Sequence, residues 1–132
     1  MIFAPTAREV DSIYGSLTAL RLPVHRYHPH MPPGDRVGEQ LNFVLPGRRS
    51  IMVATSAFGT ASGLVGVGEA ALLDKAPQDF GLCFEKRDLR FVLHWSAPAS
   101  LEQYLREISL AGRDGEESTC VLFHDGSDRA RH

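Results

Sequence analysis

No stretch of this 132-residue sequence matches the phosphate-binding loop G-x-x-x-x-G-K-[S/T]. That loop supplies the backbone amides and the lysine that hold the β- and γ-phosphates of a nucleoside triphosphate, so we expect the chain alone to hydrolyse no ATP. The sequence also lacks the G-x-S-x-G turn of the α/β-hydrolases, and neither cysteine has an obvious histidine base. Hydrolase chemistry of those kinds is therefore unsupported.

Cysteine is scarce, and the two that occur, Cys83 and Cys120, each lie in a short apolar run. They form no C-x-x-C pair, which argues against zinc and against a secreted disulfide framework, so we expect two buried free thiols. The sequence has no basic-then-apolar signal segment and no apolar run of membrane length. We therefore expect an intracellular protein without a membrane partner.

An excess of positive charge is also missing, because 14 lysines and arginines face 16 acidic residues for a net charge of −2. No global field favours nucleic acid, and any such contact must use a local patch or backbone amides. Hydrophobic residues make up 43% of the chain and charged residues 23%. This composition is typical of one globular domain with a real core.

Short apolar runs alternate with segments of helical periodicity. The runs predict strands at 1–4, 24–27, 50–55, 90–94 and 119–123, with helices between them at about 7–20, 35–44 and 101–108. This alternation is typical of an α/β fold with a mostly parallel central sheet. Ligands of such sheets bind beyond the carboxyl ends of the strands, so we expect functional residues in the loops after Thr55, His94 and Ile108.

The expected helices carry recognisable start and stop signals. Thr6 and Ser100 are each followed three residues later by an acidic or amide side chain, which is the capping-box spacing. Asp35 is expected to cap the second helix, and Pro23 is expected to end the first. The apolar stripe of the first helix is formed by Val10, Ile13, Tyr14, Leu17 and Leu20.

Two local patterns point weakly to ligands. Residues 66–71 fit a loose G-x-G-x-x-A dinucleotide fingerprint, but no clear strand precedes them, and a flexible glycine-rich insertion is the better interpretation. A stand-alone nucleotide-binding enzyme is the alternative there. His25, His28 and His30 lie close together, but no carboxylate has a convincing ligand spacing, so we expect no metal site.

The C-terminal third carries a more specific pattern. Residues 89–95 read LRFVLHW, residues 100–107 read SLEQYLRE and residues 111–115 read AGRDG. In this order and spacing they closely resemble the RecQ family of ATP-dependent DNA helicases, which typically reads DVRFVIH, SxExYYQE and GRAGRDG. The segments IFAPT at 2–6, YH at 27–28 and IMVATSAFG at 51–59 are similar to the family's motif IV, its YHAGL segment and its motif V.

The resemblance implies a three-layer RecA-like, P-loop NTPase-type domain over residues 1–132, equivalent to the second of the two lobes that hold ATP in that family. Arg113 matches the last arginine of GRAGR, which implies a catalytic arginine that contacts the nucleotide. Glu85 and Gly112 are implied as further nucleotide-binding residues. The ATP and its Mg²⁺ would be bound mainly by a first lobe, in cis, that this chain does not contain.

On the DNA side, the resemblance implies contacts to the backbone from Thr55, Ser56 and His28. The implied partner is single-stranded or forked DNA, and the implied activity is 3'–5' unwinding in DNA repair and recombination. Because Thr55 ends an expected strand, its hydroxyl and a strand-end amide could hold a phosphate without reading sequence. We expect Arg113 to lie on the same side of the sheet as the turn after Thr55.

The sequence departs from the family pattern in motif VI. Leu110 replaces the earlier arginine, Ser109 replaces a glycine and Arg106 replaces a glutamine. A leucine cannot take the place of a guanidinium at a phosphate, so nucleotide sensing is expected to be impaired. The alternative function is therefore a degenerate, non-catalytic RecA-like domain. For Arg113 itself, the alternative is a solvated arginine paired with Asp114 or Glu116.

A second departure lies in motif V, where residues 58–79 separate ATSA from the FG of Phe80–Gly81. Deleting this segment would restore the family's spacing, so it is expected to be an insertion. It is either a genuine loop or an unspliced stretch in a gene model. Nearby, Leu82–Cys83–Phe84 replaces the family's Met-Gly-Ile, and Glu85 replaces its Asp or Asn; a cysteine in place of glycine hinders close approach to phosphate.

Overall fold

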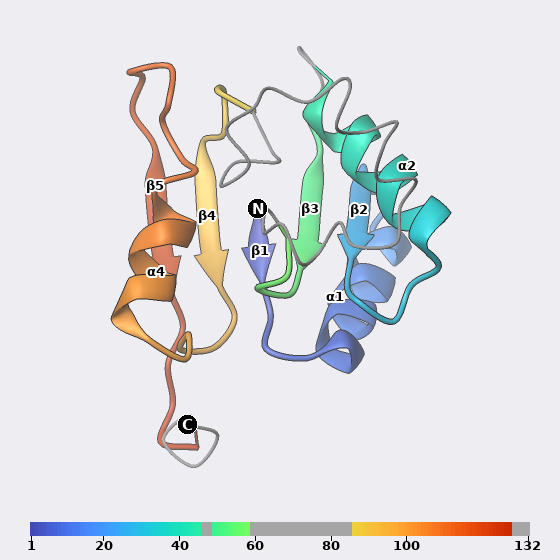
Figure 1. Ribbon diagram of the computed structural model, residues 1–132, viewed down its shortest axis with the longest axis horizontal. Helices are drawn as coiled ribbons and strands as arrows, with labels where there is room; N and C mark the ends of the chain where they lie inside the picture. The colour runs from blue at the N-terminus through green and yellow to red at the C-terminus, as the bar shows by residue number, and fades with distance from the viewer. Residues whose placement is uncertain (46–48, 59–85, 128–132) are drawn as a thin grey trace.

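The computed structural model describes residues 1–45, 49–58 and 86–127 (Figure 1). In these ranges a single sheet of five parallel strands has the order β2-β3-β1-β4-β5. The fold class predicted from the alternation of strands and helices is confirmed. The elements in chain order are β1 (Ile2–Phe3), α1 (Ala7–Ala19), β2 (Val24–Tyr27), α2 (Pro33–Val44), β3 (Ile51–Ala54), β4 (Phe91–His94), α4 (Leu101–Ile108) and β5 (Thr119–Leu122).

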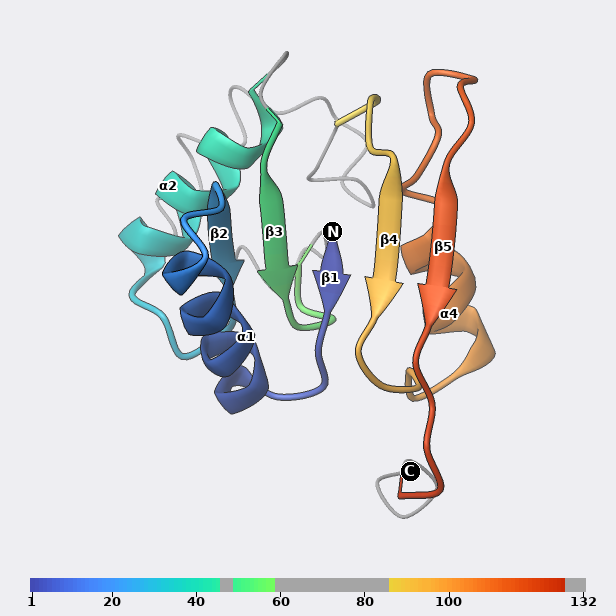
Figure 2. The ribbon, with the colours of Figure 1, turned by 180° about the vertical axis from the view of Figure 1, so that it is seen from behind.

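The described helices lie on both faces of the sheet and so give three layers. α2 and α4 lie on the face toward the viewer in Figure 1, whereas α1 lies on the opposite face, seen in Figure 2. This follows from right-handed crossovers: the chain moves one way along the sheet from β1 to β2 and the other way from β2 to β3 and from β4 to β5.

Each face of the sheet has its own apolar core, because side chains alternate along a strand. On the α1 face, Val53 of β3 packs with Ala4 and with Val10 of α1, all at most 4% exposed. On the α2 and α4 face, Met52 and Ala54 of β3 pack with Val92 of β4. That core is completed by Met1, Phe3, Tyr27, Phe43, Phe58, Leu89 and Leu110.

Two of the three expected helix caps form. The Thr6 hydroxyl accepts a hydrogen bond from the Glu9 amide at 3.2 Å, and the Ser100 hydroxyl accepts one from the Gln103 amide at 3.1 Å. The expectation for Asp35 is wrong. α2 begins earlier, with Pro33 in its first turn and Pro32 at the N-cap, and the Asp35 amide instead donates to the Pro32 carbonyl. Proline is favoured at that position since it needs no donor there.

Two other sequence expectations are wrong. Leu20 does not continue the apolar stripe of α1: it is the C-cap, 69% exposed, and Arg21 after it takes a left-handed φ of 59°. Cys120 is exposed rather than buried, because none of the four residues of β5 is covered. Figure 2 shows why, since α1 covers β2 and β3 but leaves the same face of β4 and β5 open. Cys83 lies outside the described residues.

In the described part of the chain, no helix is long and apolar enough to cross a membrane.

Candidate functional site

The sequence-predicted residues separate to the two ends of the sheet. Thr55 and Ser56 follow β3 at the carboxyl ends of the strands. Gly112 and Arg113 follow α4, which runs back against the strands, and the Gly112 amide donates to the carbonyl of Leu89, just before β4, at 3.0 Å. Arg113 therefore lies at the amino ends. The expectation that it shares a side with the turn after Thr55 is wrong, because a helix between parallel strands returns the chain to the opposite end.

At the carboxyl ends, the hydroxyl of Thr55 is buried without a partner. Thr55 is 8% exposed, and its Oγ1 has no hydrogen bond. Its backbone is fully used, because its amide donates to the Tyr27 carbonyl and its carbonyl accepts from the Phe58 amide. An orphan buried hydroxyl costs free energy and is often satisfied by a ligand. Ser56 beside it is exposed.

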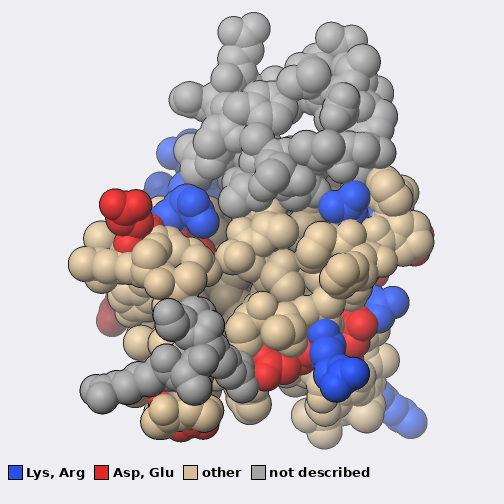
Figure 3. Space-filling model, turned by 60° about the horizontal axis from the view of Figure 1, so that its bottom comes forward, with Lys and Arg blue, Asp and Glu red and all other residues tan. Residues whose placement is uncertain are grey.

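Helices α1 and α4 both start at this end of the sheet (Figure 1). The first amides of a helix have no intrahelical partner and favour anions. Figure 3, with the carboxyl ends turned forward, shows lysines and arginines interspersed with carboxylates and no continuous basic patch on the part that is not grey. A phosphate held here would depend on amides and hydroxyls rather than on a cluster of cations.

His28 at this end is already engaged within the chain. It is 5% exposed; its Nδ1 accepts from the His30 amide at 3.2 Å, and its Nε2 lies 3.0 Å from Asp11 Oδ1. Since Nδ1 is an acceptor, Nε2 carries the proton and donates to Asp11. Arg26 donates to the same carboxylate oxygen at 2.8 Å. His28 therefore orders the loop before α2, and neither ring nitrogen is available to a ligand.

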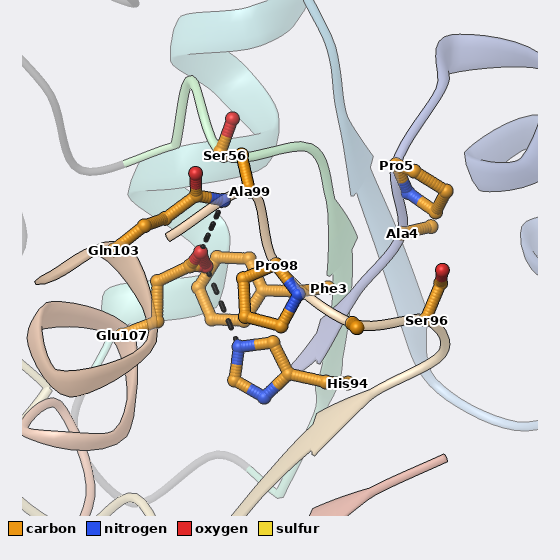
Figure 4. Close-up of a pocket in the computed structure, with 11 residues that line it drawn as sticks. Phe3, Ala4, Pro5, Ser56, His94, Ser96, Pro98, Ala99, Gln103 and Glu107 are labelled. Atoms are coloured by element: carbon orange, nitrogen blue, oxygen red, sulfur yellow. Dashed lines mark hydrogen bonds and ion pairs between the residues drawn. The ribbon is translucent and has the colours of Figure 1, made fainter. Parts of the chain in front are cut away.

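A cavity of about 110 Å³ opens between the ends of β1, β3 and β4 and the side of α4 (Figure 4). It lies where the chain leaves neighbouring strands toward opposite faces, which is where ligands of open α/β sheets bind. His94 and Glu107 line it, only 2% and 3% exposed, with Nε2 and Oε2 3.5 Å apart. The Gln103 amide donates to the other Glu107 oxygen at 2.9 Å.

This buried pair was missed by sequence reasoning. His94 was seen only as the end of a strand and Glu107 only as part of a helix. The His94 ring also stacks on Phe3, with centroids 5.3 Å apart, and packs at 5.2 Å from Tyr104. The signal was present in the sequence, because both residues belong to the two segments of highest resemblance, RFVLH and SLEQYLRE.

At the amino ends, Arg90 joins the loop after α4 to the segment before β4. Its Nη2 lies 2.5 Å from Asp114 Oδ1, its Nη1 donates to the Glu117 carbonyl at 2.7 Å, and its Nε donates to the Asp88 carbonyl at 3.1 Å. We call these four residues the Arg90 cluster. The Arg90 guanidinium lowers the pKa of the Asp114 carboxyl below its usual value, and a hydrogen bond from the Glu116 amide lowers it further.

The N-terminal amine is buried at the same end, where it donates to the Phe91 carbonyl at 2.9 Å. Burial, with the nearby Lys86, lowers the pKa of the Met1 amine from 8.0 to about 5. At neutral pH it is therefore uncharged and adds no cation to this end.

Arg113 forms no ion pair with a carboxylate of the described residues. Its Nε donates to the Ser109 carbonyl at 3.2 Å, and its side chain is partly exposed. The alternative pairing with Asp114 does not occur, because that carboxylate binds Arg90 instead. Leu110, in the place of the other family arginine, is 7% exposed and belongs to the core.

Several predictions fall outside the described residues: Glu85, the glycine pattern at 66–71 and most of the expected insertion at 58–79. Phe58, the first residue of that segment, is described and is 3% exposed. Its ring packs edge-on against Tyr27 at 5.1 Å and Phe43 at 6.3 Å. In the described ranges, no three histidine, cysteine or acidic side chains are grouped as metal ligands would be.

Comparison with known proteins points in one direction, although no family model matches the chain. The sequence is 33% identical over 128 residues to the ATP-dependent DNA helicase RecQ of Bacillus subtilis, covering 97% of this chain and 18% of that protein. It is 33% identical over 125 residues to the ATP-dependent DNA helicase Q-like 5 of Arabidopsis thaliana, and 28% identical over 131 residues to the RecQ-like DNA helicase blm-1 of Caenorhabditis elegans. It spans 11% of each of those two proteins.

A solved structure gives the same answer for the fold. The C-terminal domain of the DEAD-box protein Dbp5 superposes with a TM-score of 0.63 over 98% of this chain and 63% of that one, at 18% sequence identity. This identity supports the fold alone, which is a RecA-like α/β domain.

Proposed function

The chain is similar along nearly its whole length to one segment of RecQ-family helicases, and we propose that it is the second motor lobe of such a helicase. The observation that carries the proposal is Arg113: a guanidinium without a carboxylate partner among the described residues, on a loop held to the sheet. An arginine of this kind fits phosphate oxygens. The proposed lobe spans residues 1–132, with an insertion at about 58–79.

The nucleotide site is proposed at the amino ends of the strands. ATP with Mg²⁺, held mainly by a first lobe in cis, would present its phosphates to Arg113. Gly112 fits this role, because its φ of +68° brings the backbone of the loop close to Ser118 and leaves no room for a Cβ. Glu85 is proposed to contact the nucleotide from the segment before β4. Bound ATP supplies the bond whose hydrolysis drives the motor, and Arg113 would stabilise the charge that develops on the transferred phosphate.

The DNA site is proposed at the carboxyl ends. The unpartnered Thr55 hydroxyl, the exposed Ser56 and the first amides of α1 can donate to backbone phosphates. This accounts for DNA binding by a lobe of net charge −2 without a basic patch. His28 would act indirectly, through the loop that it holds with Asp11.

Placing the two ligands at opposite ends gives the lobe its mechanical role. Closure of two lobes on ATP would move the carboxyl-end surface along single-stranded or forked DNA. We propose 3'–5' movement, a role in repair or recombination and an intracellular location on the strength of the family resemblance.

A second candidate, a non-catalytic RecA-like domain, is favoured by one observation. Leu110 is packed in the core where the family has an arginine, so one phosphate contact is lost. The two candidates differ in activity once a first lobe is present.

The test is a fusion in which this chain replaces its matching segment of the Bacillus subtilis RecQ. DNA-stimulated release of phosphate by the fusion, with none from this chain alone, supports the motor lobe. A fusion that folds and binds ATP but hydrolyses none would favour the non-catalytic domain.

A further inference from the structure

We propose that Arg90 is the positioning residue for Arg113: by binding Asp114, it prevents this carboxylate from pairing with the arginine beside it. The inference rests on the proposed function, since it concerns the arginine assigned to the nucleotide phosphates. Arg90 would touch no substrate itself.

The contacts of the Arg90 cluster surround Arg113 on the C-terminal side. Arg90 holds Asp114 through the side chain and Glu117 through the backbone carbonyl, residues that lie 24 and 27 positions away along the chain. The Asp114 amide also donates to the Arg87 carbonyl at 3.1 Å. One guanidinium thus fixes both the charge and the path of the loop directly after Arg113.

On the N-terminal side, Gly112 fixes the loop. Its amide bonds to Leu89, its φ is +68°, and a Cβ built there would lie 2.8 Å from Ser118 Oγ. Only glycine adopts this conformation at no cost. Arg113 therefore projects from a segment held on both sides, with one hydrogen bond of its own, to Ser109.

Asp114 is the carboxylate nearest to Arg113 in sequence, and it has two acceptor contacts, from Arg90 and from the Glu116 amide. Removing the Arg90 guanidinium would leave an exposed aspartate next to an exposed arginine. Such a pair gains up to about 1 kcal/mol. A phosphate would then have to compete with Asp114 for Arg113.

The test uses this chain and inorganic tripolyphosphate as the probe, with affinity measured by calorimetry. R90Q is expected to weaken binding about three- to fivefold, as the strength of an exposed ion pair implies. The double variant R90Q/D114N is expected to restore it, because no carboxylate then competes. R87Q is the matched control: it removes the same charge from the same segment, and the side chain of Arg87 has no hydrogen bond or ion pair. It should bind tripolyphosphate like the parent.

A purely structural role for Arg90 predicts no rescue by D114N, and that result would overturn the inference. The second measurement is the hydrogen-exchange rate of the Arg113 Nε proton by NMR. It should slow in R90Q, when Arg113 pairs with Asp114, and return to the parent rate in R90Q/D114N. An Arg113 proton unaffected by R90Q, in a folded variant, also contradicts the inference.

The proposed function fails separately. If R113Q binds tripolyphosphate as well as the parent does, Arg113 is not a phosphate ligand, whereas the exchange rates still decide whether Arg90 positions it.

Discussion

Thr55 and Arg113 lie at opposite ends of the same parallel sheet, one after β3 and the other after the helix that returns from β4. Substitution at one end should therefore affect one ligand. We expect T55V to weaken binding of single-stranded DNA about tenfold, since a hydrogen bond to a charged group contributes about 1.5–3 kcal/mol. Binding of tripolyphosphate should not change. Fluorescence anisotropy of a labelled oligonucleotide measures the first effect.

T18V is the matched control for T55V, because the Thr18 hydroxyl donates to Tyr14 within α1 and belongs to neither site. Equal loss of DNA affinity in the two variants would show that Thr55 has no direct role.

Gly112 and Gly115 provide a test of how tightly the Arg113 loop is held. Both have positive φ, but a Cβ at Gly112 would meet Ser118, whereas one at Gly115 has no atom within 4 Å. G115A should cost only the left-handed backbone, about 1–2 kcal/mol. G112A should cost more than that in urea unfolding, and S118G should recover part of the difference. If G112A and G115A are equally destabilised, the close approach to Ser118 contributes nothing.

The buried His94–Glu107 pair predicts an asymmetric response to substitution. E107A should destabilise the domain by about 3–5 kcal/mol, since it leaves His94 and Gln103 without their partner. Replacing both members by apolar residues, in H94F/E107L, should cost much less. E102A on the exposed side of α4 is the control and should change the free energy of unfolding by about 0.5 kcal/mol or less. A double variant as unstable as E107A would contradict this account.

Phe58 bears on the insertion. Phe-Gly occurs at 58–59 and again at 80–81, so removing residues 58–79 leaves the same sequence as removing 60–81. The shortened chain keeps a phenylalanine after Ala57 and should be about as stable as the parent. F58A in the parent should lose about 3–5 kcal/mol, because its ring is 3% exposed. Thermal unfolding of both decides. A shortened chain that fails to fold would show that the segment belongs to the domain.

The sequence predicted the element types well, because each strand is a short apolar run and two helices carry capping boxes that form as expected. It failed where a single residue depends on its neighbours in three dimensions. Cys120 is apolar in context but lies on an uncovered edge strand. Asp35 is a good cap, yet Pro33 starts the helix two residues earlier.

The candidate site was predictable as residues but not as an arrangement. The resemblance identified Thr55 and Arg113, whereas the return path of α4 determines that they lie apart. His28 has the residue type of a ligand-binding side chain, but Asp11 and His30 occupy both its nitrogens, and these contacts cross sequence distances that no motif spans. Arg90 was recognised as part of a strand, because its partners lie 24 or more residues away.

The most direct test of the motor-lobe assignment is the kcat of DNA-stimulated ATP hydrolysis in the Bacillus RecQ fusion, with and without R113A. We predict that R113A lowers kcat by a factor of about 10³ or more, as expected for an arginine that contacts the transferred phosphate. R87A should leave it unchanged. An R113A fusion that hydrolyses ATP at the parent rate would contradict the assignment.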